Sequence, residues 1–166
     1  MEGGSANDYD YCSADPVNCT DLTGTYSYSY SYRIGRGDSD DAAFLMLWLR
    51  NSPNRMFPFK VSGGPIRKGA RLCVYPLGGC DPVRVTSASR SSFTFTALAG
   101  HVEGAGGTIK FSITSRKGNL YFAVSARGPD TFTSLINPIR HLFAGYLWGQ
   151  MAASLTENWR FLQHAA

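Results

Sequence analysis

The C-terminal part of the chain holds three segments in which apolar and polar residues alternate, followed by one long amphipathic segment. The alternating segments are 93–98, 108–114 and 120–126. A period of two places the apolar side chains on one face of a β-strand. Residues 137–163 instead carry apolar side chains at intervals of three and four, which predicts a terminal helix. A curved antiparallel sheet closed by one long helix can enclose a cavity, so this pattern predicts a pocket for a hydrophobic ligand.

The preceding part of the chain predicts the rest of the sheet. Residues 24–34 alternate mainly between tyrosine and serine and form the clearest strand pattern in the sequence. Asp38 is a suitable cap for a short buried helix over 42–49, which ends before Pro53. Three short segments bounded by Gly or Pro are further predicted strands, namely 57–61, 70–75 and 83–88.

The connections between neighbouring predicted strands define the fold class. They are too short to hold crossover helices, so the sheet must be antiparallel. Gly118 and Asn119 are expected to close one hairpin, and residues 88–92 another. We therefore predict an α+β fold: a curved seven-stranded antiparallel sheet wrapped around a long C-terminal helix, with one short helix after the first strand.

Length and composition indicate one domain. Residues 1–22 are rich in Gly, Ser, Asp and Pro and are expected to form a flexible polar arm. Residues 23–166 are expected to form a single domain, large enough to bury most of its apolar surface without disulfides. Charged residues make up 17% of the chain and aromatic residues 13%, which favours a large apolar interior or pocket.

The charge pattern and the missing motifs exclude several classes of function. The chain has 16 basic and 12 acidic residues, and the basic ones are scattered, so no nucleic-acid partner is expected. No run of eighteen apolar residues exists, so no membrane span is expected. Three histidines without clustered acids predict no catalytic metal, and the absence of nucleotide-binding glycine motifs predicts no cofactor. The sequence leaves open whether the chain forms a homodimer.

The four cysteines leave two alternatives for the compartment. Cys12 and Cys19, like Cys73 and Cys80, are separated by six residues, a spacing that fits no common zinc site. Two local disulfides would accompany secretion, and Asn18 begins a glycosylation sequon. The N-terminus lacks the basic and apolar regions of a signal peptide, which favours free thiols in the cytoplasm.

The first predicted strand supplies the main candidates for chemistry. Tyr26, Tyr28, Tyr30 and Tyr32 share one of its faces. If that face points inward, the hydroxyls are polar groups in an apolar wall, and a ligand oxygen could bind them. Plain packing against the terminal helix is an equal alternative. Tyr28 and Tyr30 are the catalytic candidates on this strand.

A Gly-rich loop supplies the second pair of catalytic candidates. His101 and Glu103 have the right side chains for proton transfer, although a solvated loop is the alternative. Gly145 and Gly149 on the terminal helix indicate close approach of a strand or a ligand, with a strand favoured. The remaining candidates are predicted to bind the ligand, and they are Tyr26, Tyr32, Trp48, Phe95, Phe111, Phe122, Arg127, Tyr146 and Trp148.

The order of these elements resembles the helix-grip fold of the START-like (SRPBCC) superfamily, which includes polyketide cyclases, lipid-transfer domains and birch-pollen-allergen-like proteins. The likeness in residues lies at 98–109 and at 146–155, where Trp148, Met151 and Leu155 are similar to a pattern of that superfamily's last helix. The superfamily typically has two helices after the first strand, whereas this sequence predicts one.

The resemblance implies a hydrophobic polyketide-like or polycyclic ligand. It further implies a cofactor-independent cyclase or dehydratase, in which the pocket folds the substrate and tyrosines or His101 move protons. A non-catalytic carrier or sequestering protein for a lipid or metabolite is the alternative. A secreted lectin-like module held by its cysteines is a third.

Overall fold

The computed structural model describes residues 25–101, 105–129 and 137–165, with side chains for 27–101, 105–128 and 143–165. In this part of the chain seven strands form one antiparallel sheet with the order β1-β7-β6-β5-β4-β3-β2. The strands are β1 (Thr25–Arg36), β2 (Val61–Ser62), β3 (Arg71–Val74), β4 (Asp81–Ala88), β5 (Ser92–Ala97), β6 (Thr108–Arg116) and β7 (Asn119–Pro129).

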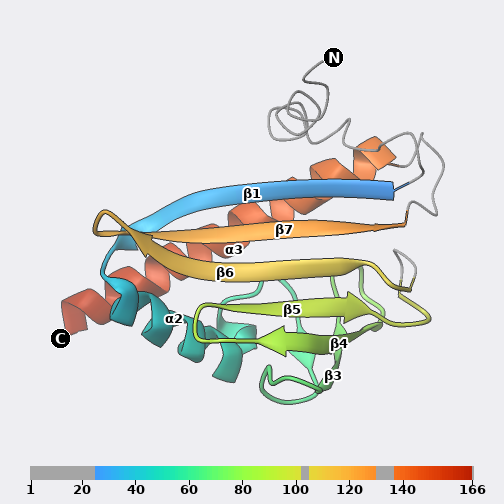
Figure 1. Cartoon of the computed structure of the whole chain (residues 1–166), viewed down its shortest axis with the longest axis horizontal. Coiled ribbons are helices and arrows are strands. Elements are labelled where there is room, and N and C mark those ends of the chain that lie inside the picture. Colours follow the sequence, from blue (N-terminus) through green and yellow to red (C-terminus); the bar gives the residue numbers. More distant parts are fainter. Residues whose placement is uncertain (1–24, 102–104, 130–136, 166) are drawn as a thin grey trace.

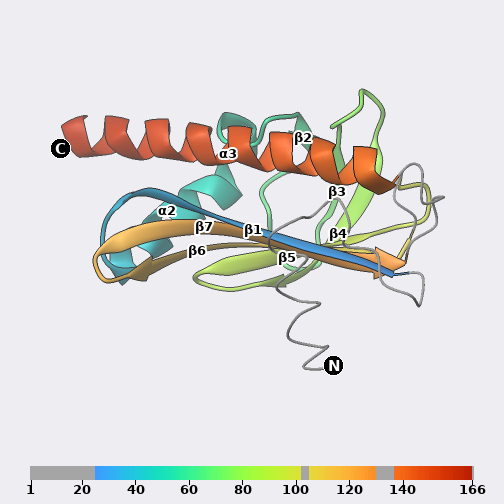
Figure 2. The same cartoon turned by 90° about the horizontal axis from the view of Figure 1, so that it is seen from above.

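The helices lie together on one side of the sheet (Figures 1 and 2). They are α2 (Ser39–Asn51), the short 3-10 helix η2 (Pro53–Arg55) and α3 (Asn137–Ala165). Helix α2 contacts β6, while α3 runs along β1. The predicted α+β fold class is confirmed: a seven-stranded antiparallel sheet, one short helix after the first strand and a long C-terminal helix. The predicted arm over 1–22 lies outside the described residues.

Helix α2 begins where the sequence predicted a cap. The Asp38 side chain accepts a 2.9 Å hydrogen bond from the Asp41 backbone N–H, and the Asp41 side chain accepts one of 2.9 Å from the Asp38 N–H. This hydrogen bond from Asp41 lowers the pKa of the Asp38 carboxyl below its ordinary value. Because the reciprocal cap satisfies the first turn, α2 starts at Ser39, directly after the predicted cap, and its acidic first turn precedes the buried segment 42–49.

The hairpin between β6 and β7 corrects one prediction. Its turn residues are Lys117 and Gly118, not Gly118 and Asn119, because Arg116 and Asn119 are already paired across the two strands. Lys117 has a φ of 52° and Gly118 a φ of 77°. A two-residue hairpin turn of this kind needs positive φ at both positions, and glycine adopts it without a steric penalty.

The C-terminal half of α3 is fixed to β1 at a bulge. The register of β1 against β7 shifts between Arg33 and Gly35. A Cβ atom at Gly35 would lie 2.7 Å from Cδ1 of Trp159, so only glycine lets the indole pack there. The indole Nε1 donates a 2.9 Å hydrogen bond to the Arg36 carbonyl oxygen. Glycine at the bulge thus gives the terminal helix a defined docking point.

The alternating strands bury the side chains that the sequence predicted. Phe111 and Ile113 of β6 and Phe122 and Val124 of β7 are at most 1% exposed. On α3, Leu147, Met151, Leu155 and Trp159 are buried as predicted. Tyr146 was wrongly placed in this stripe: it is 62% exposed, and Trp148 lies on the buried side instead. Apolar spacing alone did not fix which of these neighbouring aromatic residues turns inward.

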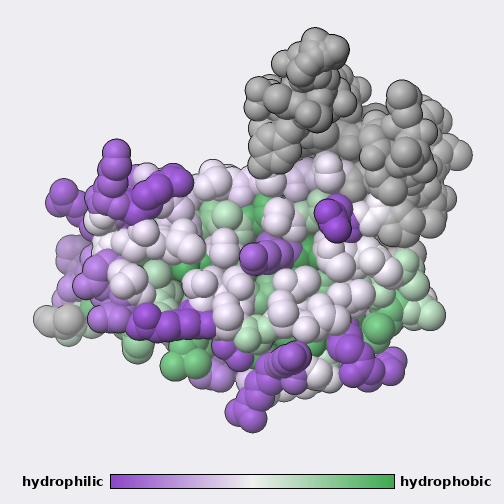
Figure 3. Space-filling view, in the orientation of Figure 1, coloured by the Kyte–Doolittle hydropathy of each residue, from purple (hydrophilic) through white to green (hydrophobic). Residues whose placement is uncertain are grey.

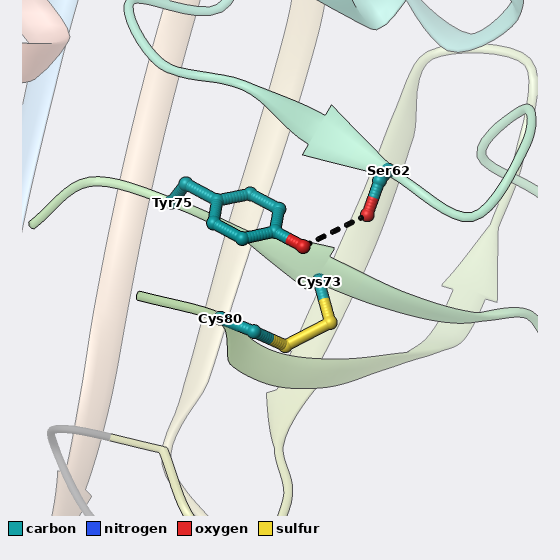
Figure 4. The surroundings of a disulfide bond; sticks show 4 residues. All are labelled: Ser62, Cys73, Tyr75 and Cys80. Atoms are coloured by element: carbon teal, nitrogen blue, oxygen red, sulfur yellow. Dashed lines mark hydrogen bonds between the residues drawn. A yellow bond between two sulfur atoms is a disulfide. The ribbon is translucent and has the colours of Figure 1, made fainter. Parts of the chain in front are cut away.

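A disulfide joins Cys73 at the end of β3 to Cys80 just before β4 (Figure 4). The expectation of free thiols is wrong for this pair, whereas Cys12 and Cys19 lie outside the described residues. Beside the bridge, the hydroxyl of Tyr75 lies 3.4 Å from that of Ser62 in hydrogen-bonding contact. The bridge therefore closes the turn at this corner of the sheet. Within the described residues, we find no helix that is long and apolar enough to cross a membrane.

Candidate functional site

Three tyrosines of β1 form a row on the side of the strand that faces α3. We call Tyr28, Tyr30 and Tyr32 the phenol row; their ring centroids are 5.5 Å and 6.4 Å apart in sequence order. Ser27 and Ser31 between and beside them are exposed on the opposite side. The row exists because β1 alternates aromatic and hydroxyl side chains with a period of two. The side chain of Tyr26 lies outside the described residues.

The inner end of the row is held by the terminal helix. Tyr28 is 5% exposed, and its hydroxyl accepts a 3.2 Å hydrogen bond from Nε1 of Trp148. A buried indole N–H and a buried phenol both require polar partners, and here each meets part of the other's requirement. Trp148 therefore positions Tyr28, a role that the sequence did not predict for it.

The other two phenols are half-buried and stay protonated near neutral pH. Burial raises the pKa of Tyr30, and repulsion from Tyr32 raises it further. Burial also raises the pKa of Tyr32. Because the folded state favours the neutral phenol, Tyr30 and Tyr32 stabilise the fold at pH values below the ordinary phenol pKa. This stabilisation is lost as the pH rises through the raised pKa values of the two phenols. Both groups are suited to donating hydrogen bonds rather than to accepting protons as phenolates.

Gly145 and Gly149 of α3 differ in their surroundings. A Cβ atom at Gly145 would lie 3.1 Å from the Tyr30 hydroxyl oxygen, which confirms the favoured prediction of close strand contact there. At Gly149, one turn further along, a Cβ atom would meet nothing within 4 Å. The helix surface therefore leaves open space at Gly149, between the contact with Tyr30 and the contact of Trp159 with Gly35.

This difference makes a testable pair of substitutions. Gly149→Ala is expected to raise the free energy of unfolding by about 1 kcal/mol, because alanine is the better helix former and has room. Gly145→Ala is expected to lose that gain, because the new methyl group displaces the Tyr30 phenol. Thermal and urea unfolding of both variants measures the difference. Equal stabilisation by the two substitutions would contradict the close approach of Tyr30 to α3.

Aromatic side chains fill the interior beyond the phenol row. Phe111 lies at the centre, with ring centroids 5.0 Å from Phe93, 5.4 Å from Phe57 and 5.2 Å from Trp148. The ring centroid of Phe95 lies 5.6 Å from that of Phe111. The predicted ligand-binding residues Phe95, Phe111, Phe122 and Trp148 are thus brought together, and all four are buried. In the described structure these side chains pack against one another as core.

Two residues of this aromatic cluster were not predicted from the sequence. Phe57 and Phe59, which follow η2, pack into the aromatic cluster, with Phe59 6.1 Å from Trp148 between ring centroids. Their segment was expected to be a strand, but β2 begins only at Val61. The Phe-Pro-Phe sequence was the available signal, since two aromatic residues flanking a proline can enter a core from a loop.

Other candidates lie away from the phenol row. Arg127 is exposed on the opposite face of β7, and Tyr146 is exposed on α3, where its hydroxyl accepts a 2.8 Å hydrogen bond from Gln150. Trp48 of α2 is half-buried beneath the Arg55 guanidinium, 5.7 Å from the ring centroid. None of these three side chains contacts the row in the described residues.

The predicted pair of His101 and Glu103 is only half described. His101 is half-buried in the loop after β5, and its backbone N–H donates a 3.1 Å hydrogen bond to the Leu98 carbonyl oxygen. Glu103 lies outside the described residues. The strand register places this loop at the same end of the sheet as Tyr28, three strands away from β1, or ~14 Å along the sheet.

A hollow lies on the surface near η2. It has a volume of about 320 Å³ and is open to solvent. Its lining residues are Asn51, Ser52, Pro53, Asn54, Arg55, Val61, Gly64 and Pro65. The Asn54 side chain both donates to and accepts from the Val61 backbone at 2.8 Å. These hydrogen bonds hold η2 against the start of β2, which gives the residues of this hollow a structural role. Nowhere in the described chain do three His, Cys, Asp or Glu side chains gather to hold a metal ion.

Comparison with solved structures identifies the fold. The di-domain ARO/CYC protein StfQ from the steffimycin biosynthetic pathway matches with a TM-score of 0.59 and 10% identity, over 86% of this chain and 53% of StfQ. Norcoclaurine synthase from Thalictrum flavum, in complex with dopamine and hydroxybenzaldehyde, matches with a TM-score of 0.57 and 12% identity, over 86% of this chain and 90% of the synthase.

The chain has the helix-grip fold, and the predicted resemblance to the START-like superfamily is confirmed for the fold. Ara h 8.0201 shares this fold, with a TM-score of 0.54 and 9% identity over 81% of this chain and 99% of that one. No protein-family model and no curated protein sequence matches the chain. At these identities the likeness shows the fold alone.

Proposed function

We propose that the chain binds a hydrophobic polycyclic or polyketide-like small molecule along the phenol row, between β1 and α3. The observation that carries this proposal is the row itself: three phenols point from an edge strand toward an otherwise apolar interior. Tyr30 and Tyr32 are only half-buried, and the adjoining surface of α3 is open at Gly149. A flat aromatic ligand can stack there and receive hydrogen bonds from the phenols.

The raised pKa values of Tyr30 and Tyr32 define what such a site can do chemically. Neutral phenols donate hydrogen bonds to a carbonyl oxygen, and these bonds strengthen as negative charge develops on that oxygen. The row would therefore stabilise an enolate or alkoxide of a bound ketone. A cofactor-independent cyclase or dehydratase uses this chemistry. A carbon next to a carbonyl loses a proton and attacks a second carbonyl carbon of the same molecule, and the alkoxide formed takes up a proton. That hydroxyl then leaves as water together with a hydrogen from the adjacent carbon, which leaves a double bond.

A non-catalytic carrier or sequestering protein is the alternative. The observation that favours it is the tight packing of the interior around Phe111, which limits the ligand to the margin of the phenol row. In that case the phenols select a ligand without changing it. A homodimer stays a prediction.

Binding is tested with a hydroxylated anthraquinone as the probe, followed by quenching of tryptophan fluorescence. Tyr30→Phe combined with Tyr32→Phe is expected to weaken binding about tenfold, since each lost hydrogen bond contributes roughly 1 kcal/mol or less. Tyr121→Phe is the matched control, because Tyr121 lies on the opposite face of the sheet beneath Arg116. Equal affinity for all variants, or no binding by the natural chain, would contradict the proposed site.

Enzyme and carrier are separated with an aromatic β-polyketone mimic. An enzyme is expected to accelerate the loss of one water from it, measured by mass spectrometry, and Tyr28→Phe or His101→Ala should reduce turnover while retaining affinity. A carrier binds the mimic and returns it unchanged in every variant. Tyr28→Phe also leaves the Trp148 N–H without its phenol acceptor, so its stability must be measured in parallel.

The bridge between Cys73 and Cys80 supports a role in an oxidising compartment, because such bonds rarely persist in the cytosol. We therefore favour secretion over the cytoplasmic location that the N-terminal sequence favoured. Mass spectrometry of the natural protein after thiol labelling, without prior reduction, tests this. Labelling of both cysteines would contradict it.

A further inference from the structure

The face of the sheet turned away from the helices is built almost entirely from hydroxyl and basic side chains. We call it the outer sheet face; the views of the whole chain show that neither α2 nor α3 covers it (Figures 1 and 2). Its side chains alternate with buried ones along each strand. They are Ser27, Ser29, Ser31, Arg33, Arg71, Cys73, Pro82, Arg84, Thr86, Ser87, Ser92, Thr94, Thr96, Thr108, Lys110, Ser112, Thr114, Arg116, Asn119, Tyr121, Ala123, Ser125 and Arg127.

The outer sheet face carries six positive charges and no acidic side chain. In the space-filling view it is a pale expanse of weakly polar residues with separate strongly hydrophilic groups (Figure 3). Arg90 forms an ion pair with Asp40, and neither residue belongs to this face. Lys110 and Arg127 at its centre make no hydrogen bond or ion pair in that part of the chain. Their charges are available to an external partner.

The part of the chain that contains the outer sheet face is more positively charged than the chain as a whole. Five of the chain's 12 acidic residues lie in residues 1–24, which contain no Lys or Arg. The remainder therefore carries 16 basic residues against seven acidic ones. A surface of one sign attracts ligands of the opposite sign and raises their local concentration.

The strand register arranges the groups of this face in rows. One row crosses six strands as Arg71, Arg84, Thr96, Thr108, Arg127 and Ser27. The next row holds Thr94, Lys110, Ser125 and Ser29. Neighbouring members of a row are ~4.8 Å apart, the spacing of paired strands. Cations separated by hydroxyls at this spacing form a lattice that suits a polymer with repeating anionic groups and hydroxyls.

We propose that the outer sheet face binds an acidic polysaccharide, bearing sulfate or carboxylate groups. Arginine donates paired hydrogen bonds to such groups, while serine and threonine hydroxyls bond to the sugar hydroxyls. The disulfide independently supports a location where extracellular polymers are met.

The same residues make other polyanions poorer partners. Single-stranded nucleic acids bind through bases stacked on exposed aromatic rings. The only aromatic residue of this face is Tyr121, and the Arg116 guanidinium covers its ring at 4.3 Å from the centroid. Insertion into a membrane requires large apolar side chains, and among the described residues this face offers only the small side chains of Cys73, Pro82 and Ala123.

The proposal is tested with the full chain and heparin as the sulfated probe, with polygalacturonate as the carboxylated one, by calorimetry at low and physiological salt. Lys110→Ala combined with Arg127→Ala is expected to weaken binding about tenfold, because two exposed cationic contacts of roughly 0.7 kcal/mol each are removed. Binding should also weaken as salt rises. The matched control removes the same charge elsewhere: Arg55→Ala with Arg160→Ala, both on the helix side, should bind like the natural chain.

Three further probes can contradict the proposal. Neutral dextran should not bind, and single-stranded DNA and phosphatidylserine vesicles should bind more weakly than heparin. Equal loss in both double variants would show attraction by net charge alone, and tighter binding of DNA or vesicles would assign the face to that partner; both outcomes overturn the proposal. Unchanged melting temperatures in all variants ensure that a loss of binding is not a loss of fold.

Discussion

Replacing Phe111 with alanine is expected to lower the free energy of unfolding by about 3–5 kcal/mol, the usual cost of removing a fully buried phenyl ring. Phe111 is 1% exposed and lies in ring contact with Phe57, Phe93, Phe95 and Trp148. The neighbours project from β5, from α3 and from the segment after η2, so they cannot close together without moving the sheet against α3. Urea unfolding monitored by tryptophan fluorescence measures the loss.

The control for Phe111→Ala is its neighbour in the sequence. Ser112→Ala changes a half-buried residue on the outer sheet face, so a change within about 0.5 kcal/mol is expected. A loss below roughly 1 kcal/mol for Phe111→Ala would mean that the aromatic cluster repacks readily. The interior would then be loose enough to admit a ligand beyond the phenol row. The substitution thus also tests how deep the candidate site extends.

Removing the bridge by Cys73→Ala with Cys80→Ala is expected to lower the free energy of unfolding by about 2–3 kcal/mol. The estimate follows from the short loop that the bridge closes, since cross-linking restricts the unfolded chain. Calorimetric unfolding of the oxidised natural chain and of the double variant measures the difference.

Reductant provides the control for the bridge. It should lower the melting temperature of the natural chain to that of the double variant, and it should leave the double variant unchanged. A further decrease in the double variant would indicate that Cys12 and Cys19 also contribute a stabilising bond. Identical melting temperatures for all four samples would contradict a stabilising role for the bond between Cys73 and Cys80.

Much of the fold could be predicted because period-two and helical patterns respond to burial alone. The alternation in β1, β6 and β7 identified the strands, and in β6 and β7 also their inner faces, while Asp38 marked the start of α2. The phenol row also followed from alternation, whereas its orientation toward α3 was left open by the sequence and is given by the structure.

The less accurate predictions concerned details that depend on three-dimensional contacts. Tyr146 and Trp148 are both compatible with an apolar helix stripe, and only in the folded chain does Trp148 turn inward, where its N–H donates to the Tyr28 hydroxyl. The loop from η2 to β2 delivers Phe57 to the core without any periodicity. Free thiols were favoured from the N-terminal sequence, which carries no information about the distance between Cys73 and Cys80. That distance, 5.1 Å between Cα atoms, exists only once β3 and β4 are paired.

The pairing of β1 with β7 has a consequence for how the protein is made. The first strand of the sheet has a single neighbour, and that neighbour is the last strand to be synthesised. On the ribosome, the tyrosine-rich strand therefore waits with both edges unpaired until β7 has emerged. Contacts so distant along the chain form slowly, and exposed edges invite association between nascent copies. Efficient production should consequently depend on chaperone capacity or low expression rate more than on the stability of the finished fold.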